Sequence, residues 1–487
     1  MREYDVVVIG TGMGSLTTAC LLAQKELNCL VLEQNYLAGG CTSSYWRKGF
    51  VFESGATTLV GLDEGMPLRW LIDTLGIKTL SPTRLEVPMQ VHLANGETIT
   101  RHQDLDAWIT EAERVFGVKN QRKFWKFCYQ ISQFVWQTSL KQTAFPPTRL
   151  ADLWHCATHT NLQQLYYAQY AFYTMDGLLK KFDLDKNQLF VDFVNEQLLI
   201  TAQNYAPEVN ILFGATALCY TNYGNYYVDG GLINLINPFL AYLQAQGATV
   251  QMRETVENIV YQAGKYQIQT NKDIYTSKYL ISGIPINNLL DIYAGKYQQH
   301  WHKKILTSEN LHSAFQMGLA FRGTQARACV HHQIHLSEPL QEVQARSLFL
   351  SLNHTKDHTR SDEAGYTVAS VSTHLHHPEK NIIADKKAVE EAIINTLQTH
   401  GFLNPTDIVY QHSSAQKSWA KWTGRKYGFV GGYPQLKRIK PWQMPATRID
   451  GKGAYLCGDT AYPGQGIPGV VLGGIIAFKQ LQRDALS

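Results

Sequence analysis

The chain has 487 residues, of which 45% are hydrophobic and 17% are charged, and its formal net charge is +4. A single hydrophobic core does not serve a chain of this length, so we expect two or three domains. The composition excludes a disordered protein. The mild positive charge gives no reason to expect nucleic acid as a partner.

Cysteine usage and the first residues predict where the protein works. Eight cysteines are scattered along the chain without CxxC spacing, which favours reduced, buried thiols over disulfides or zinc ligands. Residues 1–5 show neither a signal-peptide core nor a transit-peptide pattern, so we expect a cytoplasmic protein. The longest apolar run, residues 467–478, is interrupted by glycines and is shorter than the roughly 20 residues of a membrane-spanning helix.

A glycine-rich turn joins an expected strand at residues 6–9 to a helix that starts near Gly14. Gly10 permits the tight turn, and Gly12 lets the backbone approach a phosphate. The free N–H groups at the start of the helix would then face the anion. Ser15 stands where a third glycine usually packs the helix against the strand. Because serine is small, we expect a slight spacing cost and no loss of binding.

An acidic residue about 20 positions further on is expected to bind the ribose hydroxyls of a dinucleotide. Residues 28–33 form an apolar strand that ends in Glu33, whose charge would also repel the additional phosphate of NADP. The loop that follows contains Gly39 and Gly40, which suits close passage along the cofactor. Strand, turn, helix, second strand and Glu33 together predict a dinucleotide site.

The last segment of the chain points to a flavin. A strand at residues 455–457 ends in Gly458 and Asp459, and residues 462–470 contain three glycines where a flat ring could lie against the backbone. A helix that begins near Pro468 would direct its positive dipole end at the flavin edge where negative charge develops on reduction. The two ends of the chain are therefore expected to share one cofactor.

The order of motifs predicts an α/β protein with three parts. A discontinuous, Rossmann-like FAD-binding domain is expected from residues 1–65, 222–285 and 421–487. Residues 66–104 and 286–420 are expected to form a mixed-sheet substrate domain. Residues 105–221 are expected to be a helical insertion.

Taken together, these motifs resemble the phytoene desaturase family of FAD-dependent carotenoid enzymes, and residues 462–470 are the most specific part of the likeness. This family also contains carotenoid isomerases and retinol saturases. The resemblance spans the whole chain and implies an amine-oxidase-type fold with extended, non-covalently bound FAD. It implies cofactor contacts from Gly10, Gly12, Gly14, Ser15, Glu33, Gly39, Gly40, Cys41, Thr42, Val256, Gly458, Asp459, Gly466, Ile467 and Val470. Many relatives carry an arginine directly after the double glycine, where this chain has Cys41.

The helical insertion carries an unusual charge pattern. Residues 119–149 contain six basic and no acidic residues, and a helical wheel places Trp125, Tyr129 and Trp136 on one stripe. An exposed aromatic stripe beside cations is typical of a helix in an anionic membrane interface. We therefore expect peripheral binding to the inner face of a membrane. The alternative is a helix that is buried on both sides.

Two groups of histidines have the density of metal ligands: His331, His332, His335, and His374, His376, His377. Neither group has accompanying cysteines or a helical zinc motif. We expect no metal, and we interpret these histidines as polar surface residues near the entrance for substrate.

The family resemblance implies an oxidoreductase that acts on a long apolar polyene, in the first place a carotenoid desaturase. A hydride would pass to flavin N5, and a quinone or oxygen would accept the electrons. The aromatic residues 165–173 are expected to line an apolar tunnel. No acid or base residue is identifiable; Arg149 and Asp152 are candidates, and the alternative is a simple helix start at Asp152.

Four other functions stay open at this point. A redox-neutral carotenoid cis–trans isomerase and a retinol-saturase-like enzyme would use the same cofactor and tunnel. An amine oxidase would share the fold but would need a polar, aromatic amine site. A non-catalytic prenyl-binding escort protein would share the fold without the chemistry, although Glu33 and Asp459 argue against it.

Overall fold

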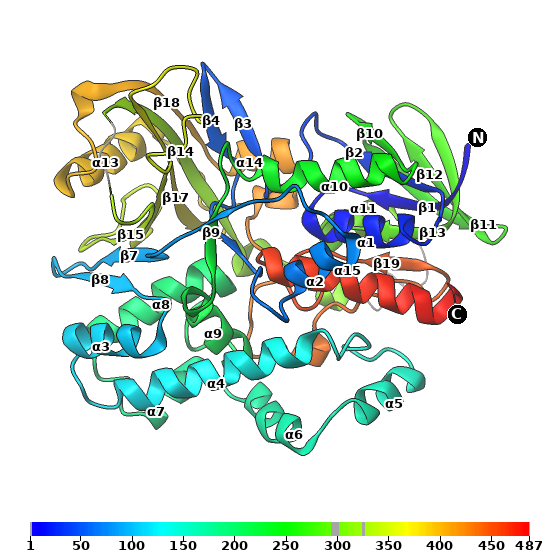
Figure 1. Cartoon of the computed structure of the whole chain (residues 1–487), viewed down its shortest axis with the longest axis horizontal. Coiled ribbons are helices and arrows are strands. Elements are labelled where there is room, and N and C mark those ends of the chain that lie inside the picture. The colour runs from blue at the N-terminus through cyan, green and yellow to red at the C-terminus, as the bar shows by residue number, and fades with distance from the viewer. Residues whose placement is uncertain (1, 294–300, 324–326, 487) are drawn as a thin grey trace.

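The computed structural model describes residues 2–293, 301–323 and 327–486. Two seven-stranded sheets lie side by side in the upper part of Figure 1, and a group of helices lies below them. The strands of each sheet come from separated segments of the chain. The α/β fold that the sequence predicts is confirmed.

The first sheet has the strand order β10-β2-β1-β13-β12-β11, with β19 paired to β13. β1 runs parallel to β2 and β13, which places Val8 beside Val31 and Ile281. These central residues are buried, as expected for parallel strands that are covered on both faces. The strands are β1 (Arg2–Ile9), β2 (Cys29–Glu33), β10 (Thr249–Met252), β11 (Val256–Gln262), β12 (Lys265–Thr270), β13 (Ile274–Ser282) and β19 (Ala454–Leu456).

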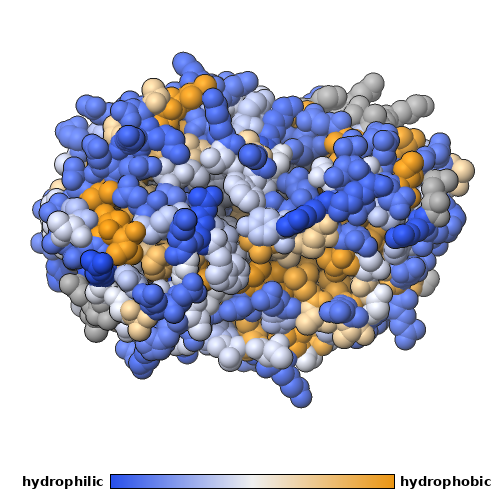
Figure 2. Space-filling view, turned by 90° about the horizontal axis from the view of Figure 1, so that it is seen from above, coloured by the Kyte–Doolittle hydropathy of each residue, from blue (hydrophilic) through white to orange (hydrophobic). Residues whose placement is uncertain are grey.

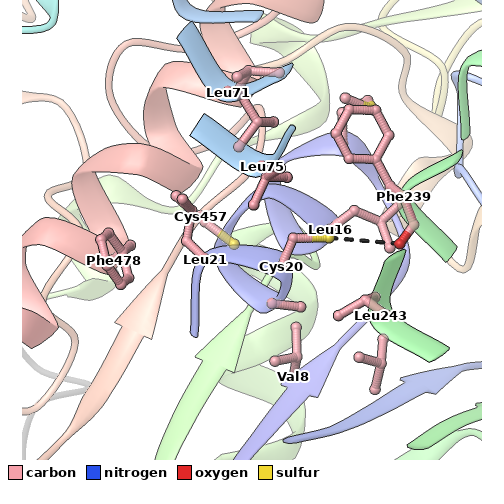
Figure 3. Packing of buried hydrophobic residues seen from close by; sticks show 14 of the residues in the cluster. Val8, Leu16, Cys20, Leu21, Leu71, Leu75, Phe239, Leu243, Cys457 and Phe478 are labelled. Atoms are coloured by element: carbon pink, nitrogen blue, oxygen red, sulfur yellow. Dashed lines mark hydrogen bonds between the residues drawn. The ribbon is translucent and has the colours of Figure 1, made fainter. Parts of the chain in front are cut away.

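The helices on this sheet form a shared core. Every residue of α1 is buried, because α2, α10 and α15 contact it on different sides. Figure 3 shows Leu16 and Cys20 of α1 close to Phe239 of α10, and the Cys20 thiol donates to the Phe239 carbonyl oxygen at 3.6 Å. The helices are α1 (Met13–Ala23), α2 (Pro67–Leu75), α10 (Ile233–Ala245), α11 (Ile286–Ile292) and α15 (Ile467–Leu481).

The second sheet has the order β18-β14-β17-β16-β15-β7-β8. Its strands pair in antiparallel fashion except β15 and β7, which are parallel. α13 (Lys386–Thr399) packs Val389, Ile393 and Leu397 into the same apolar cluster as β14 and β17. The strands are β7 (Met89–His92), β8 (Thr98–Arg101), β14 (His312–Arg322), β15 (His331–His335), β16 (Ser347–Leu352), β17 (Tyr366–His376) and β18 (Ile408–Ser414).

Shorter elements connect the two sheets. β3 (Ser44–Arg47) and β4 (Phe50–Glu53) form a hairpin, and β5 (Leu59–Val60), β9 (Asn225–Tyr227) and β6 (Thr83–Arg84) form a small three-stranded sheet. α14 (Gln416–Thr423) follows β18 directly. The sheet strands fall within the segments that the sequence assigns to two domains, and the domain boundaries themselves stay a prediction.

The helical region occupies residues 105–218 and packs around Trp108, Trp125, Phe190 and Phe193. The guanidinium of Arg101 is buried among these rings, 4.0 Å from the centre of the Trp108 ring. The helices are α3 (Leu105–Phe116), α4 (Gln121–Ser139), α5 (Leu150–Thr158), α6 (Leu162–Ala168), η1 (Gln169–Phe172), α7 (Met175–Lys181), α8 (Gln188–Ala202) and α9 (Ile211–Leu218).

The expected exposed stripe on α4 is wrong at Trp125. This side chain is fully buried, with its ring 4.9 Å from that of Trp108, and its indole N–H donates to Gln121 Oε1 at 2.9 Å. Tyr129 stacks on Tyr223, and Trp136 is half-buried. The reason is that α3, α8 and α9 pack around this helix, which a helical wheel of α4 alone does not reveal.

The expectation of surface histidines is also wrong for one group. His331, His332 and His335 lie on β15, between β16 and β7, and all three are buried. Burial, together with nearby His92, lowers the pKa of His332 to about 3, so the ring is neutral at physiological pH. In the described residues no group of three or more His, Cys, Asp or Glu side chains is arranged to hold a metal ion.

The expected free thiols are confirmed, since all eight cysteines are unbridged and six are buried.

Seen from above, the molecule is mainly hydrophilic around its rim, and hydrophobic side chains gather to the right of centre (Figure 2). Across the described ranges, no helix has the length and apolar character needed to cross a membrane.

Candidate functional site

A cavity of about 570 Å³ opens where the carboxyl ends of β1, β2, β13 and β19 meet. Its wall begins at residues 9–15 after β1 and continues through residues 32–37 after β2. The wall then includes residues 283–285 after β13 and Gly458 and Asp459 after β19. In α/β sheets ligands bind at this edge of the strands.

The glycine turn and the start of α1 have backbone features that favour an anion. Gly10 has φ +87, a conformation that favours glycine, and a Cβ at Gly12 would meet nothing within 4 Å, so this side of the backbone is open. α1 starts at Met13 with no side-chain cap on its first N–H groups and no acidic residue in its first turn. Uncapped N–H groups and the helix dipole favour a phosphate at this position.

Gly14 and Ser15 fix the spacing between α1 and the strands. A Cβ at Gly14 would lie 2.8 Å from the Gly458 nitrogen, so the first and last segments touch there. Ser15 donates to the Ile9 carbonyl oxygen at 3.2 Å, and a Cβ at Gly283 would lie 1.8 Å from the Ser15 Oγ. Gly283 therefore makes room for the serine. Its position directly after a buried strand was the signal for it in the sequence.

Glu33 lies in the cavity wall with its carboxylate fixed from both sides. One oxygen accepts the Thr11 N–H at 2.9 Å and the Thr11 hydroxyl at 2.5 Å, and the other accepts the Asn35 N–H at 2.8 Å. Val256 and Glu254 border the same cavity. This arrangement orients an acceptor for hydroxyl groups at one end of the cavity.

The double-glycine loop brings Cys41 and Thr42 to the cavity, and a Cβ at Gly39 would lie 2.5 Å from the Thr42 carbonyl oxygen. Burial raises the pKa of the Cys41 thiol, and the charge of Arg425 partly opposes this. A cation therefore acts on position 41, although it comes from another part of the chain.

Arg425, from the loop after α14, was not anticipated from the sequence. Its Nη2 donates to Asp459 Oδ2 at 2.5 Å, and its Nη1 donates to the Gly431 carbonyl oxygen at 2.8 Å. Both Arg425 and Asp459 line the cavity. No local motif marks Arg425, and Cys41, where many relatives carry an arginine, only put a charge contact to the cofactor at that position in doubt.

The wall that faces the second sheet contains polar and aromatic side chains. Tyr45 on β3 and His412 on β18 share a hydrogen bond of 2.7 Å, and Gln316 on β14 donates to the Glu53 carbonyl oxygen at 2.7 Å. Burial and nearby Arg47 lower the pKa of His412 to about 4. The histidine is therefore neutral at physiological pH. No pattern in the sequence marks this wall.

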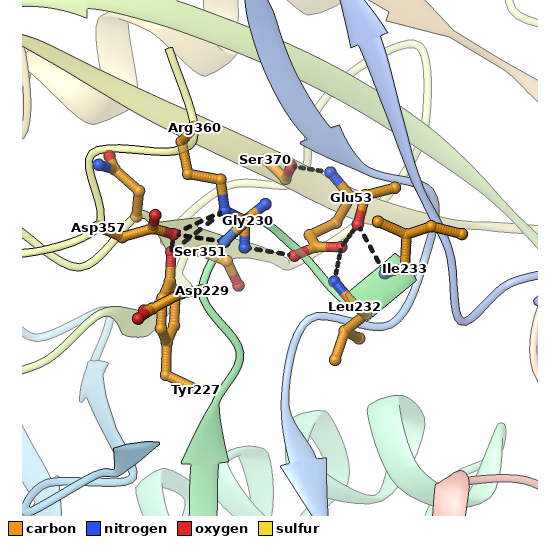
Figure 4. Close-up of polar contacts among 12 residues, drawn as sticks. Glu53, Tyr227, Asp229, Gly230, Leu232, Ile233, Ser351, Asp357, Arg360 and Ser370 are labelled. Carbon is orange, nitrogen blue, oxygen red and sulfur yellow. Dashed lines mark hydrogen bonds and ion pairs between the residues drawn. The ribbon is translucent and has the colours of Figure 1, made fainter. Parts of the chain in front are cut away.

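A buried ionic network holds the segments behind the cavity together (Figure 4). Arg360 donates to Glu53 Oε1 at 2.6 Å and to Asp357 Oδ2 at 3.2 Å, and Asp357 accepts the Tyr227 hydroxyl at 2.7 Å. Glu53 also accepts the Leu232 N–H at 3.2 Å, at the start of α10. Each buried charge has a partner, which indicates a positioning role for this network.

Most predicted cofactor residues border this one cavity: Gly10, Gly12, Gly14, Ser15, Glu33, Gly39, Gly40, Cys41, Thr42, Val256, Gly458, Asp459 and Val470. Gly466 and Ile467 do not line it, because they cap and begin α15 while Val470 lies one turn further along the helix. The site assignment itself stays a prediction.

The two acid–base candidates lie elsewhere. Asp152 is 3% exposed and accepts the Thr148 and Arg149 N–H groups at 3.0 and 3.1 Å, and Arg448 at 2.6 Å. Arg149 pairs with Asp484 at 2.9 Å. Neither candidate lines the cavity, and the bonds of Asp152 match the alternative of a capped helix start. In the aromatic stretch expected to line a tunnel, Leu165, Tyr166, Phe172 and Tyr173 are exposed on the surface instead.

Comparison with known families decides the class of the protein. Residues 16–480 match the model of the flavin containing amine oxidoreductases. The chain belongs to this family. It is therefore a flavin-dependent enzyme with the α/β fold of these oxidoreductases, as the sequence predicts.

The curated proteins that are similar to this chain include a prolycopene isomerase and a retinol reductase. The chain is 23% identical to a chloroplastic prolycopene isomerase of Daucus carota, over 99% of this chain and 80% of that protein. It is 24% identical to an all-trans-retinol 13,14-reductase of Danio rerio, over 55% of this chain and 44% of that protein.

Two solved structures share its fold. Putrescine oxidase bound to putrescine matches with a TM-score of 0.65 at 14% identity, over 100% of this chain and 99% of the other. A fatty acid isomerase from P. acnes that produces CLA matches with a TM-score of 0.61 at 12% identity, over 98% of this chain and 98% of the other.

Proposed function

We propose that the cavity binds FAD without a covalent bond and that the enzyme acts on the double bonds of a long apolar polyene. The observation that carries this proposal is the joining of Glu33, the uncapped start of α1 and Asp459 in one cavity. The chain that forms this cavity is similar over 99% of its length to prolycopene isomerases.

The lining residues fit FAD in kind and in order. The N–H groups at Gly12 to Gly14 would hold the pyrophosphate, and Glu33 would bind the adenosine ribose. The backbone at Val256 would meet the adenine, and Asp459 with Arg425 would hold the ribityl chain and its phosphate. Gly12 leaves one side of the backbone open, as the approach of a dinucleotide requires, and Gly14 and Gly458 let the first and last segments pack closely beside it.

The reactive side chains of the wall favour non-covalent binding. Burial raises the pKa of Cys41, so this thiol stays protonated at neutral pH, and only the thiolate is a good nucleophile. Acid precipitation should therefore release the yellow cofactor, and mass spectrometry of the released flavin should identify FAD. Flavin that remains with the precipitate would contradict this part of the proposal.

Among polyene reactions, we rank redox-neutral cis–trans isomerisation first and desaturation second. The likeness to prolycopene isomerases covers 99% of this chain, whereas the likeness to a retinol reductase covers 55%. This reverses the order expected from the sequence, where a desaturase came first. When bound, the flavin supplies an electron and hydride acceptor; in a desaturase, a quinone or oxygen would then take the electrons.

An apolar cluster beside the last segment would keep water from such a substrate. Leu306, Leu311, Phe429 and Met444 are buried there together with Tyr433, and Tyr462 packs against them. A Cβ at Gly464 would lie 3.7 Å from the Met444 methyl group, so the cluster reaches the loop at residues 464–470. A hydrocarbon offers few hydrogen bonds, so its recognition has to come from apolar contacts of this kind.

The test is expression in cells that accumulate defined cis-carotenoids, followed by chromatography and mass spectrometry of the pigments. An isomerase converts geometry at constant mass, whereas a desaturase removes two hydrogens for each new double bond, and a saturase adds them. The matched control is Glu33→Lys, which should lose cofactor and conversion together. Unchanged pigments with a flavin-loaded protein would overturn the polyene proposal and favour the escort function.

The location of the enzyme is part of the same proposal. We propose a cytoplasmic protein that works at a membrane surface, because polyenes dissolve in bilayers and not in water. Fractionation of cells that express the enzyme should place it with membranes at low salt.

A further inference from the structure

Exposed apolar side chains are concentrated on a short part of the helical region. Of the eighteen large hydrophobic side chains that are exposed within the described ranges, eight lie between residues 150 and 173. This segment contains α5, α6 and η1, at the lower edge of the molecule in Figure 1. Soluble proteins rarely gather so many apolar groups on one surface without a partner.

α5 exposes its apolar face to solvent and directs a polar side toward the protein, the reverse of an ordinary surface helix. Leu150, Leu153 and Trp154 share one helical face and are 84%, 53% and 74% exposed. The inward side of the same helix carries Asp152, which is 3% exposed and pairs with Arg448. The ion pair fixes the polar side against the protein and leaves the apolar face unpartnered.

α6 and η1 continue the same pattern. Leu162, Leu165 and Tyr166 have the spacing of one helical face and are 86%, 60% and 56% exposed. Phe172 and Tyr173 are also exposed, and the Phe172 ring lies 5.2 Å from that of Trp442, which is 40% exposed. The exposed faces of α5, α6 and η1, together with Trp442, are called the apolar patch below.

Basic side chains outnumber acidic ones around the apolar patch. Between residues 141 and 173 the one acidic residue is Asp152, which is buried and paired, while Lys141 and Arg149 are basic and exposed, and Arg149 is paired with Asp484. Residues 432–448, which carry Trp442, contain no acidic residue and four basic ones. Of these, Lys437 and Arg438 are exposed. Further along the chain Asp176 is paired with Lys180.

We infer that the apolar patch is a docking surface for an anionic lipid membrane. Its aromatic and aliphatic side chains suit the boundary between headgroups and acyl chains, and its cations suit anionic headgroups. This surface replaces the α4 stripe, whose Trp125 is buried.

The inference rests on the proposed function in one respect, the supply of a polyene from the bilayer. Trp442 of the patch is two residues from Met444, which lies in the apolar cluster beside the loop at Gly464. Docking through the patch would bring the bilayer next to this cluster. The substrate would then leave the membrane without crossing water.

Flotation of the purified holoenzyme with vesicles tests the docking surface directly. The vesicles are phosphatidylcholine alone or phosphatidylcholine mixed with phosphatidylglycerol. Wild-type protein should float with the mixed vesicles at low salt, and salt should weaken the binding. The double variant Trp154→Gln, Leu162→Gln should bind at least about tenfold less, since two large apolar groups no longer enter the interface.

Matched variants separate the contributions. Ile382→Gln, which alters a side chain that is 57% exposed outside the patch, should bind like the wild type. Lys437→Gln with Arg438→Gln should lose affinity for mixed vesicles but not for phosphatidylcholine alone. Flavin content verifies that each variant is folded. Equal binding by wild type and Trp154→Gln, Leu162→Gln would overturn the inference.

Other occupants of the patch give different results. If a second copy covers it, sedimentation without vesicles should show a dimer that the double variant dissociates, and the membrane inference fails. Flotation needs no polyene, so a protein that floats but converts no carotenoid would contradict the proposed function alone. A protein that converts carotenoid in detergent but does not float would contradict the docking surface alone.

Discussion

Two aspartate–arginine pairs have almost the same chemistry and lie in different surroundings. Asp459 pairs with Arg425 at 2.5 Å and borders the cavity, whereas Asp152 pairs with Arg448 at 2.6 Å between α5 and the C-terminal segment. Asp152 also accepts two backbone N–H groups, and Arg448 also binds Asp484. Position therefore matters more than residue type: the pair that borders the cavity is open to a ligand, and the enclosed pair connects α5 to the C-terminal segment.

Removing the enclosed pair should have the largest effect. Arg448→Met leaves Asp152 buried without its cation and leaves Asp484 with Arg149 alone, and breaking a buried pair costs about 3–5 kcal/mol of folding free energy. A lower unfolding temperature, measured by circular dichroism, should accompany normal flavin content in the protein that remains folded. Loss of flavin without loss of stability would contradict the structural role of the enclosed pair, because it would then affect the cofactor as the cavity pair is expected to do.

Glu33 shares one feature with each aspartate: like Asp152 its carboxylate accepts several hydrogen bonds from the protein, and like Asp459 it borders the cavity. Glu33→Lys should remove a charge-assisted bond to ribose that contributes about 1.5–3 kcal/mol and add repulsion. Flavin titration of the apoprotein should show weaker binding by roughly tenfold or more. Glu33→Gln, which keeps the shape, should weaken binding less. Normal affinity in Glu33→Lys would mean that a carboxylate with several hydrogen-bond donors is structural even where it borders the cavity.

The same contrast explains what the sequence could predict. The turn at Gly10 and Gly12, Glu33 at the end of β2 and the start of α15 follow from local backbone geometry, which needs particular residue types at fixed spacing. Gly458 and Asp459 are likewise marked by the strand before them. The features that follow the parallel strands border the cavity, because these strands place their carboxyl ends together, whereas Gly466 and Ile467 at the start of α15 do not line it.

The parts that could not be predicted depend on distant neighbours. Trp125 is buried because α3 and α8 cover it, and His332 is buried because β16 and β7 flank β15. Arg425 reaches Asp459 across 34 positions of the chain without a motif of its own. Asp152 looked catalytic for its residue type, and its partner Arg448 lies 296 positions away.

Removing the cavity pair should have a moderate effect on binding. Arg425→Met leaves Asp459 without its cation and removes a charge from the cavity wall, so we expect a loss of about 1.5 kcal/mol in flavin affinity, roughly tenfold. Arg425→Lys should restore part of it, because the charge returns without the planar, two-sided geometry. Thermal stability of the apoprotein should fall less than in Arg448→Met. A larger loss of stability than in Arg448→Met would reverse the assignment of the two pairs.

Acidification should remove the contribution of the enclosed pair to folding stability over a particular pH range, and this is the smallest expected effect. Burial alone would raise the pKa of Asp484, but its hydrogen bonds with Arg448 and Tyr455 outweigh burial and hold the pKa below its usual value. A depressed carboxyl pKa stabilises the fold above the unfolded value and loses that contribution as pH falls, so the window lies below about pH 5.

Between neutral pH and that window, buried histidines dominate the loss of stability. Burial lowers the pKa of His331 to about 4 and that of His332 to about 3, so unfolding takes up protons there; for pKa values near 6.5 in the unfolded chain, each ring costs about 2 kcal/mol between pH 7 and 5. Asp484→Asn should therefore show the same decline as the wild type down to about pH 5 and a shallower one below it. Stability curves measured by urea unfolding at each pH decide the matter, since a parallel course of both proteins below that pH would exclude a stabilising charge on Asp484.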